Sequence, residues 1–112
     1  MSVVCREEGR VLYAALSGEI DHHAARTIML ELDREIESRF PSETVLDFSG
    51  VTFMDSSGIA IVLRTCRRMQ ESGGRLRAVE VPPQAGKVLR AAGVERMVSV
   101  TYQQGPKEES AT

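Results

Sequence analysis

The chain contains no tryptophan and few aromatic residues of any kind: among its 112 residues are two tyrosines and three phenylalanines. Proteins that bind single-stranded nucleic acid stack bases on several exposed rings, so this composition argues against that class. An excess of basic charge is also missing, because 14 Lys and Arg residues face 16 Asp and Glu residues and the formal net charge is −2. We therefore expect no direct contact with nucleic acid and a protein as the partner.

Cysteines and long apolar runs are scarce as well. The two cysteines, Cys5 and Cys66, stand far apart and match neither a CxxC motif nor a set of metal ligands. No apolar run approaches the roughly 20 residues needed to cross a bilayer, and no secretory or transit signal opens the chain. The sequence predicts a protein without metal or cofactor that acts in the reducing cytoplasm and not in a membrane.

The residues that are present describe one globular domain, with 42% hydrophobic and 27% charged residues. Hydrophobic periodicity and turn signals predict two strands and then three helix–strand pairs. The expected strands cover 3–5, 11–16, 45–48, 76–81 and 97–102, and the expected helices cover 22–40, 57–72 and 82–92. This order predicts an α/β fold with a small, mixed, mostly parallel β-sheet, an antiparallel N-terminal strand and flanking helices.

Within this fold the pattern predicts which faces are buried. The strand 45–48 has no polar alternation, which is typical of a strand covered on both faces, and residues 17–21 are expected to break the second strand. A polar tail, 103–112, has no apolar stripe and is expected to fray, which leaves a domain of residues 1–102. The predicted buried stripe of the first helix is Ala25, Ile28, Met29, Leu32, Ile36 and Phe40, and that of the second helix is Ile59, Val62, Leu63, Cys66 and Met69.

The segment 45–63 carries the most chemistry, because a strand there leads into a helix that begins with Asp55-Ser56-Ser57-Gly58. Free backbone N–H groups and the positive end of the helix dipole suit an oxyanion at this position, including one covalently attached to a serine. The same residue types are also preferred at ordinary helix N-caps, so a purely structural role is the alternative. Spacing alone does not choose between Ser56 and Ser57.

The segments 17–25 and 47–58 together resemble the STAS family, and within it the bacterial anti-sigma factor antagonists. The resemblance implies the STAS fold and a partner-switching protein that is not an enzyme. Such a protein binds an anti-sigma factor that is also a serine kinase and thereby frees a sigma factor. Phosphorylation, here on Ser56, releases it until a serine phosphatase restores it. The family usually adds a C-terminal helix, which the polar tail does not indicate.

The resemblance also implies that the loop with Asp21 and the residues Asp55, Ser57 and Gly58 share one binding surface with Ser56. From the helical pattern we add Ile61, an apolar residue predicted on a polar face, and Arg64, which belongs to a basic strip with Arg67 and Arg68. The structural alternatives are a single exposed apolar residue and a solvated basic face. Asp21 is in addition expected to cap the first helix.

A phosphate on Ser56 would add about −1.5 to −2 charges beside Asp55. The helix N-terminus tolerates an anion in the free domain. In an interface the same charge meets desolvation and like-charge repulsion, so release is expected without refolding.

The sequence offers three alternative interpretations. A metal site at Asp21-His22-His23 is not expected, because adjacent histidines on a helix point about 100° apart and no further ligand stands at a suitable spacing. A hydrolase with Ser56 as nucleophile is weakly supported, because Met54-Asp55-Ser56-Ser57-Gly58 is not a G-x-S-x-G elbow. The runner-up is a STAS accessory module of a transport or sensory assembly that binds protein or nucleotide.

Overall fold

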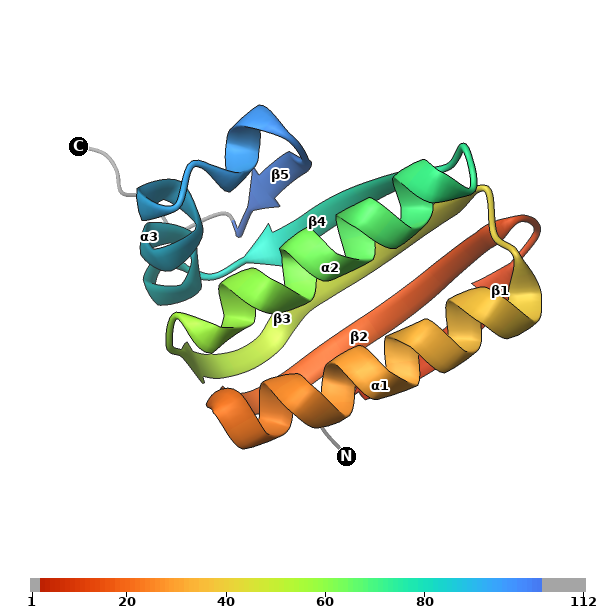
Figure 1. The fold of residues 1–112 in the computed structure, drawn as a ribbon. Coiled ribbons are helices and arrows are strands. Elements are labelled where there is room, and N and C mark those ends of the chain that lie inside the picture. The colour runs from red at the N-terminus through yellow and green to blue at the C-terminus, as the bar shows by residue number, and fades with distance from the viewer. Residues whose placement is uncertain (1–2, 104–112) are drawn as a thin grey trace.

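In the computed structural model of the protein, residues 3–103 are described, and they form a sheet with helices packed against it (Figure 1). All but the first residue of the predicted tail lies outside this range, and the domain boundary at residue 102 stays a prediction. The elements follow one another as β1 (Val3–Glu8), β2 (Val11–Ile20), α1 (His22–Arg39), β3 (Glu43–Met54), α2 (Ser57–Glu71), β4 (Arg75–Val81), α3 (Pro83–Ala91), the 3-10 helix η1 (Val94–Arg96) and β5 (Ser99–Tyr102).

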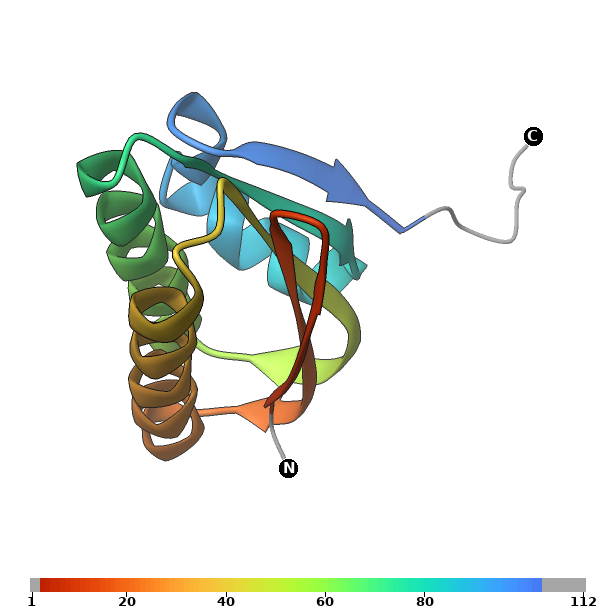
Figure 2. The same ribbon diagram turned by 90° about the vertical axis from the view of Figure 1, so that its right-hand side faces the viewer.

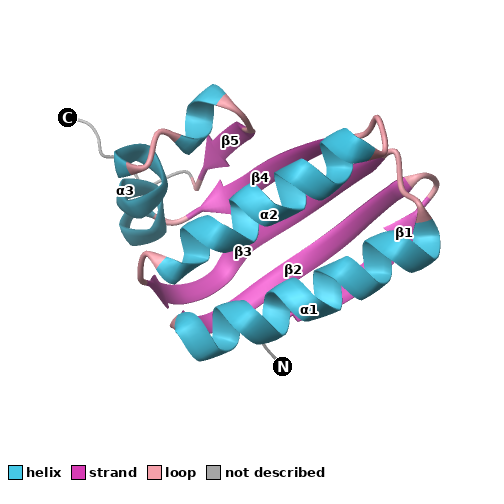
Figure 3. Ribbon diagram, in the orientation of Figure 1, coloured by secondary structure: helices cyan, strands magenta, loops and turns pink. Residues whose placement is uncertain are grey.

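The sheet has the order β1-β2-β3-β4-β5. β1 runs antiparallel to β2, and every other neighbouring pair is parallel, which confirms the predicted fold class. Helices α1 and α2 lie side by side on one face of the sheet, whereas α3 lies at its end, beyond the carboxyl end of β4 (Figures 2 and 3). The carboxyl ends of the parallel strands therefore meet the first turns of the helices at one edge.

β2 and β3 are both longer than predicted. β2 continues through the predicted break, and β3 continues from Phe48 to Met54. The two segments pair with each other, with register irregularities between Ala15 and Ser17 and after Gly18, whose φ is +81°. The turn-forming residues thus bend the ladder without ending it, as β-bulges do.

β3 is covered on one face, and the prediction that residues 45–48 are covered on both faces is wrong. Leu46 and Phe48 are fully buried, whereas Asp47 on the opposite face is only half-buried. Val45, which shares that opposite face, lies between its register partners Tyr13 and Arg77. Cross-strand neighbours can bury an apolar residue on an open sheet face, so the lack of alternation misled the prediction.

Helix α2 is rotated relative to the prediction. Ile61 is fully buried, and its predicted place on an exposed face is wrong, while Leu63, predicted in the core, is 39% exposed. The polar residue Thr65 is only 2% exposed and belongs to the buried stripe. Because the prediction counted only apolar residues as buried, it assigned the wrong face of the helix to the core. The buried residues of α2 are Gly58, Ile61, Val62, Thr65, Cys66 and Met69.

Helix α1 follows its predicted stripe except at its end. Ala25, Ile28, Leu32 and Ile36 are buried, but Phe40 is 65% exposed. Phe40 has a φ of +48° and so takes the left-handed conformation that ends the helix. The Arg10 guanidinium donates a hydrogen bond to its carbonyl oxygen at 2.7 Å. In residues 3–103, no helix is long and apolar enough to cross a membrane.

The rotation of α2 gives a direct test. Ile61→Ala removes a fully buried side chain, and we expect the free energy of unfolding to fall by about 2 to 5 kcal/mol. Leu63→Ala is the matched control, and it should cost about 1 kcal/mol or less because that side chain already faces solvent in part. Urea denaturation of both variants measures the difference. Equal losses would contradict this orientation of the helix.

Candidate functional site: the switch turn between β3 and α2

Two acidic residues meet where β2 and β3 end. Ile20 pairs with Met54, and the backbone N–H of Asp55 donates to the carbonyl of Ile20 at 3.1 Å. Asp21 and Asp55 directly follow this pair in two neighbouring parallel strands. The pairing therefore brings together the two motifs that lie far apart in the sequence.

Asp21 caps helix α1, as predicted. Its Oδ1 accepts a hydrogen bond from the backbone N–H of Ala24 at 2.9 Å. This hydrogen bond, before all other causes, lowers the pKa of the exposed Asp21 carboxyl. The next two side chains, His22 and His23, stack with ring centroids 4.3 Å apart, which the sequence did not predict. In the described part of the chain, no group of three or more His, Cys, Asp or Glu residues could hold a metal ion.

The two serines differ in their surroundings. Ser56 is exposed, has helical backbone angles and makes no capping hydrogen bond with its side chain. Ser57 is half-buried, and its backbone N–H donates to Oδ1 of Asp55 at 2.8 Å. The side chain that caps the start of α2 is thus that of Asp55 and not that of Ser56. The hydroxyl of Ser56 is left available at the surface.

The predicted supply of free N–H groups at this helix end is mostly used up. Besides the Ser57 N–H, that of Gly58 donates to the Asp55 carbonyl and that of Ile59 to the Ser56 carbonyl, both at 3.1 Å. An anion on Ser56 would therefore meet the helix dipole but few unpaired donors. It would also lie beside the Asp55 carboxylate, so the site favours an added phosphate less than the sequence suggested.

Gly58 has a different role from the one expected. It is buried, so it offers no contact surface in this conformation, and a Cβ atom built on it would lie 2.2 Å from Sδ of Met54. The fully buried Met54 side chain thus occupies the space that a larger residue at 58 would need. Residues 54 and 58 contact each other beneath the turn that carries Ser56. We call this turn, residues 54–58, the switch turn.

An apolar groove begins beside Ser57, between the first halves of α1 and α2. Of the predicted partner-binding residues it contains Ser57, but neither Ile61, which is in the core, nor Arg64. Its volume is about 380 Å³. The residues that line it are His22, Ala25, Arg26, Met29, Ser57 and Ala60.

A second hollow continues the groove along α2, from the shared residue Ala60 to Leu63, Arg64 and Arg67. Arg64 is tied to α1, because its Nη2 donates to Oδ2 of Asp33 at 2.7 Å. Arg67 is exposed and forms no ion pair with any described residue. We call the exposed residues Ala60, Leu63, Arg64 and Arg67 the α2 strip.

Two residues at this end were missed by the sequence analysis. Phe53 is 44% exposed beside the switch turn, and only its place between a strand and the Asp55-Ser56 pair could have marked it. Gln84 of α3 binds the backbone of Met54. No pattern in the sequence marks Gln84, because it belongs to the polar positions of its helix.

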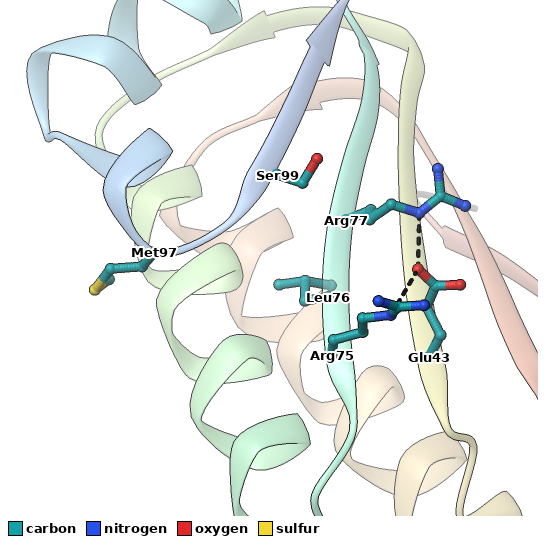
Figure 4. Close-up of a pocket in the computed structure, with 6 residues that line it drawn as sticks. All are labelled: Glu43, Arg75, Leu76, Arg77, Met97 and Ser99. Carbon is teal, nitrogen blue, oxygen red and sulfur yellow. Dashed lines mark hydrogen bonds and ion pairs between the residues drawn. The ribbon is translucent and has the colours of Figure 1, made fainter.

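Another hollow, of about 530 Å³, lies over β3, β4 and β5 (Figure 4). Two arginines line it, but Glu43 accepts a hydrogen bond from Arg77 at 2.8 Å and forms an ion pair with Arg75 at 3.7 Å. Their charge is therefore partly neutralised within the fold. This hollow gives no strong support to a nucleotide site.

The turn also offers little for nucleophilic catalysis. In the part of the chain that is described, no histidine forms a hydrogen bond with Ser56, so no base is in position to activate its hydroxyl. Burial raises the pKa of the Cys66 thiol. Burial, followed by Glu35 and Glu31, raises the pKa of Cys5 to about 11. Neither thiol is thus a ready nucleophile at neutral pH.

Comparison with known proteins identifies the family to which this fold and this turn belong. The family model described as the STAS domain matches residues 2–109. The chain therefore belongs to the STAS family. This confirms the family that the motifs at 17–25 and 47–58 indicated.

Within the family, the chain is similar to proteins named anti-sigma F factor antagonist. The one from Paenibacillus polymyxa is 30% identical over 90 residues, which cover 80% of this chain and 77% of that protein. The one from Lysinibacillus sphaericus is 32% identical over 79 residues, with 70% and 68% covered. These names describe regulators and not enzymes.

Solved structures of the antagonist SpoIIAA have the same fold. Its unphosphorylated form matches with a TM-score of 0.77 and 26% identity, over 88% of this chain and 86% of that one. Its phosphorylated form, from Bacillus, matches with a TM-score of 0.70 and 25% identity, over 88% and 89%. The same architecture is thus known with and without a phosphate.

The contact between residues 54 and 58 predicts the effect of a small substitution. Gly58→Ala forces the buried Met54 side chain aside, and we expect the free energy of unfolding to fall by about 1 to 3 kcal/mol. Ser56→Ala is the matched control. It should change stability by no more than about 0.5 kcal/mol, because Ser56 makes no capping hydrogen bond. Thermal and urea unfolding measure both, and a loss near 1 kcal/mol for Ser56→Ala would mean that Ser56 is a cap after all.

Proposed function

We propose that this protein is an anti-sigma factor antagonist that works by partner switching. It binds an anti-sigma factor that is also a serine kinase, frees a sigma factor, and is released when the kinase phosphorylates Ser56; a serine phosphatase restores it. The observation that carries the proposal is the exposed Ser56 hydroxyl, which the fold does not use, next to a Ser57 that is tied to Asp55. The names of the relatives support the same function.

The binding surface extends from the switch turn along α2. Asp55 and Ser57 flank Ser56 in the chain, and Asp21 follows the end of the neighbouring strand. The α2 strip continues from there with apolar residues first and arginines further on. The complementary partner surface carries an apolar side chain near the serine and acidic groups beyond it. Arg67 is the arginine of the strip best suited to those groups, because Arg64 is already paired with Asp33.

Phosphorylation acts on this surface through charge. The phosphate adds about −1.5 to −2 charges next to Asp55, in a turn whose N–H donors are mostly paired. In the free protein, water and salt screen this charge. Between two protein surfaces it must lose that water beside an apolar partner side chain, so the complex weakens while the fold persists. The reducing cytoplasm, where sigma factors act, is the proposed location.

The first prediction of this model is a phosphorylated site at one residue. Incubation of the protein with its anti-sigma factor kinase and ATP should add one phosphate to the wild type and to Ser57→Ala, and none to Ser56→Ala. Intact-mass spectrometry measures each product. Since the exposed serine is the one removed in Ser56→Ala, its loss of phosphorylation is not expected to reflect unfolding.

The same experiment separates the alternatives. Tight binding of the kinase without any gain in mass would indicate a constitutive binding module and contradict the switch. Phosphate on Ser56→Ala but not on Ser57→Ala would move the switch to Ser57. An accessory module of a transport or sensory assembly would neither bind the kinase nor gain mass.

The second prediction concerns Arg67. Arg67→Glu reverses an unpaired charge on the α2 strip, and we expect the dissociation constant for the kinase to rise about tenfold at low salt, mainly through slower association. Surface plasmon resonance at several salt concentrations measures this, and the difference should shrink as salt increases.

Arg34→Glu is the control for Arg67→Glu, because it makes the same charge change on α1, where the Arg34 side chain is 73% exposed. It should leave the dissociation constant within about twofold. Equal effects of the two substitutions would show that net charge, and not the α2 strip, governs binding.

A further inference from the structure

The carboxyl end of β3 lacks a strand on one side. β4 pairs with β3 from Glu43 to Asp47 only, whereas β3 continues to Met54. On the other side β2 pairs with β3 as far as Met54, and the N–H of Asp55 donates to the carbonyl of Ile20. Backbone groups alternate in direction along a strand, so the N–H and C=O of Met54 point toward the side that β4 has left.

Gln84 fills this gap with its side chain. Its Nε2 donates to the Met54 carbonyl at 2.8 Å, and its Oε1 accepts from the Met54 N–H, also at 2.8 Å. A primary amide offers a donor and an acceptor side by side, as a backbone segment does. The side chain of Gln84 therefore replaces one missing residue of β4.

Helix α3 holds Gln84 in place. Its neighbour Ala85 and Leu89 are buried in the main core. Gly86 lets the ring of Tyr102 approach closely, since a Cβ atom there would lie 3.1 Å from that ring, and the Arg90 guanidinium lies 5.0 Å from the ring centroid. α3 thus packs against both the core and β5, and these contacts fix the position of Gln84.

Met54 connects Gln84 to the first turn of α2. Its backbone is held by Gln84, and its side chain supports Gly58 in the first turn of α2. Ser56 lies midway between these two residues. A shift of Met54 would therefore move both ends of the turn that presents the hydroxyl.

We propose that Gln84 is a positioning residue for the Ser56 switch: it holds Met54 so that the Ser56 hydroxyl is presented to the kinase in one orientation. This role rests on the proposed function. It differs from docking, because Gln84 is half-buried behind the turn and does not belong to the α2 strip. Loss of the two hydrogen bonds should slow phosphoryl transfer and leave kinase binding unchanged.

The test uses Gln84→Glu, in which the ionised carboxylate can accept from the Met54 N–H but cannot donate to its carbonyl. At pH 7.5 we expect kcat for phosphorylation of Ser56 to fall about tenfold, with KM within twofold, because the Met54 carbonyl has lost its donor. A protonated carboxyl has both a donor and an acceptor. The Met54 carbonyl oxygen, which would face the introduced carboxylate, raises the pKa of that carboxyl above the ordinary value of about 4.3. The ratio of variant to wild-type kcat should therefore rise toward one as the pH is lowered to 5.5.

Two further variants complete the design. Gln84→Met removes both hydrogen bonds at similar length, so hydrogen exchange of the Met54 amide should quicken. It should also lower kcat at every pH without recovery in acid. Gln70→Glu makes the same charge change at an exposed position of α2 and should leave kcat unchanged. Circular dichroism confirms that each variant is folded before it is compared.

The outcomes are distinct. Wild-type kcat in Gln84→Met, with faster exchange of the Met54 amide, would overturn the positioning role and leave the proposed function intact. Unchanged exchange of that amide in Gln84→Met would overturn the restraint itself. A rise in KM alone would assign Gln84 to docking. A wild-type protein that gains no phosphate would overturn the proposed function, and the positioning role with it.

Discussion

The parallel pairing of β2 with β3 is the constraint on which the site depends. It ends with Ile20 beside Met54, so the residues that follow, Asp21 and Asp55, leave neighbouring strands at the same level. Each then caps the helix that comes next, Asp21 through the N–H of Ala24 and Asp55 through that of Ser57. Both carboxylates are thereby fixed at helix N-termini, where the dipole favours them. A slip in this register would separate the two motifs.

The capping by Asp55 explains why the neighbouring serine is free. A helix N-terminus has a limited number of unpaired donors, and here the preceding carboxylate and two tight turns use most of them. Ser56 has no structural task left, so a modification of its hydroxyl costs the fold little. The same arrangement means that a phosphate would find few donors within its own chain. Its charge would therefore interact mainly with solvent or with the surface of a bound partner.

The sequence was sufficient for the element order, the sheet type and the motif, because these follow from periodicity, chain connectivity and capping preferences. It failed where burial depends on partners far away in the chain. The burial of Ile61 and Leu63 was predicted the wrong way round, because a buried threonine, Thr65, interrupts the apolar stripe of α2. Gln84 gave no signal at all, since its role comes only from the gap that β4 leaves beside Met54.

A switch of this kind has to combine an accessible hydroxyl with a fixed position. Surface turns usually gain access by being loosely held, which spreads the hydroxyl over many orientations and slows transfer to it. Here the turn is held from beneath: Met54 is fully buried, its backbone is bound by Gln84, and its side chain supports Gly58. Ser56 is thus exposed on a turn whose buried side is held by these contacts. In the proposed function, a phosphate on Ser56 therefore weakens the complex by its charge at the contact surface and not by a rearrangement of this turn.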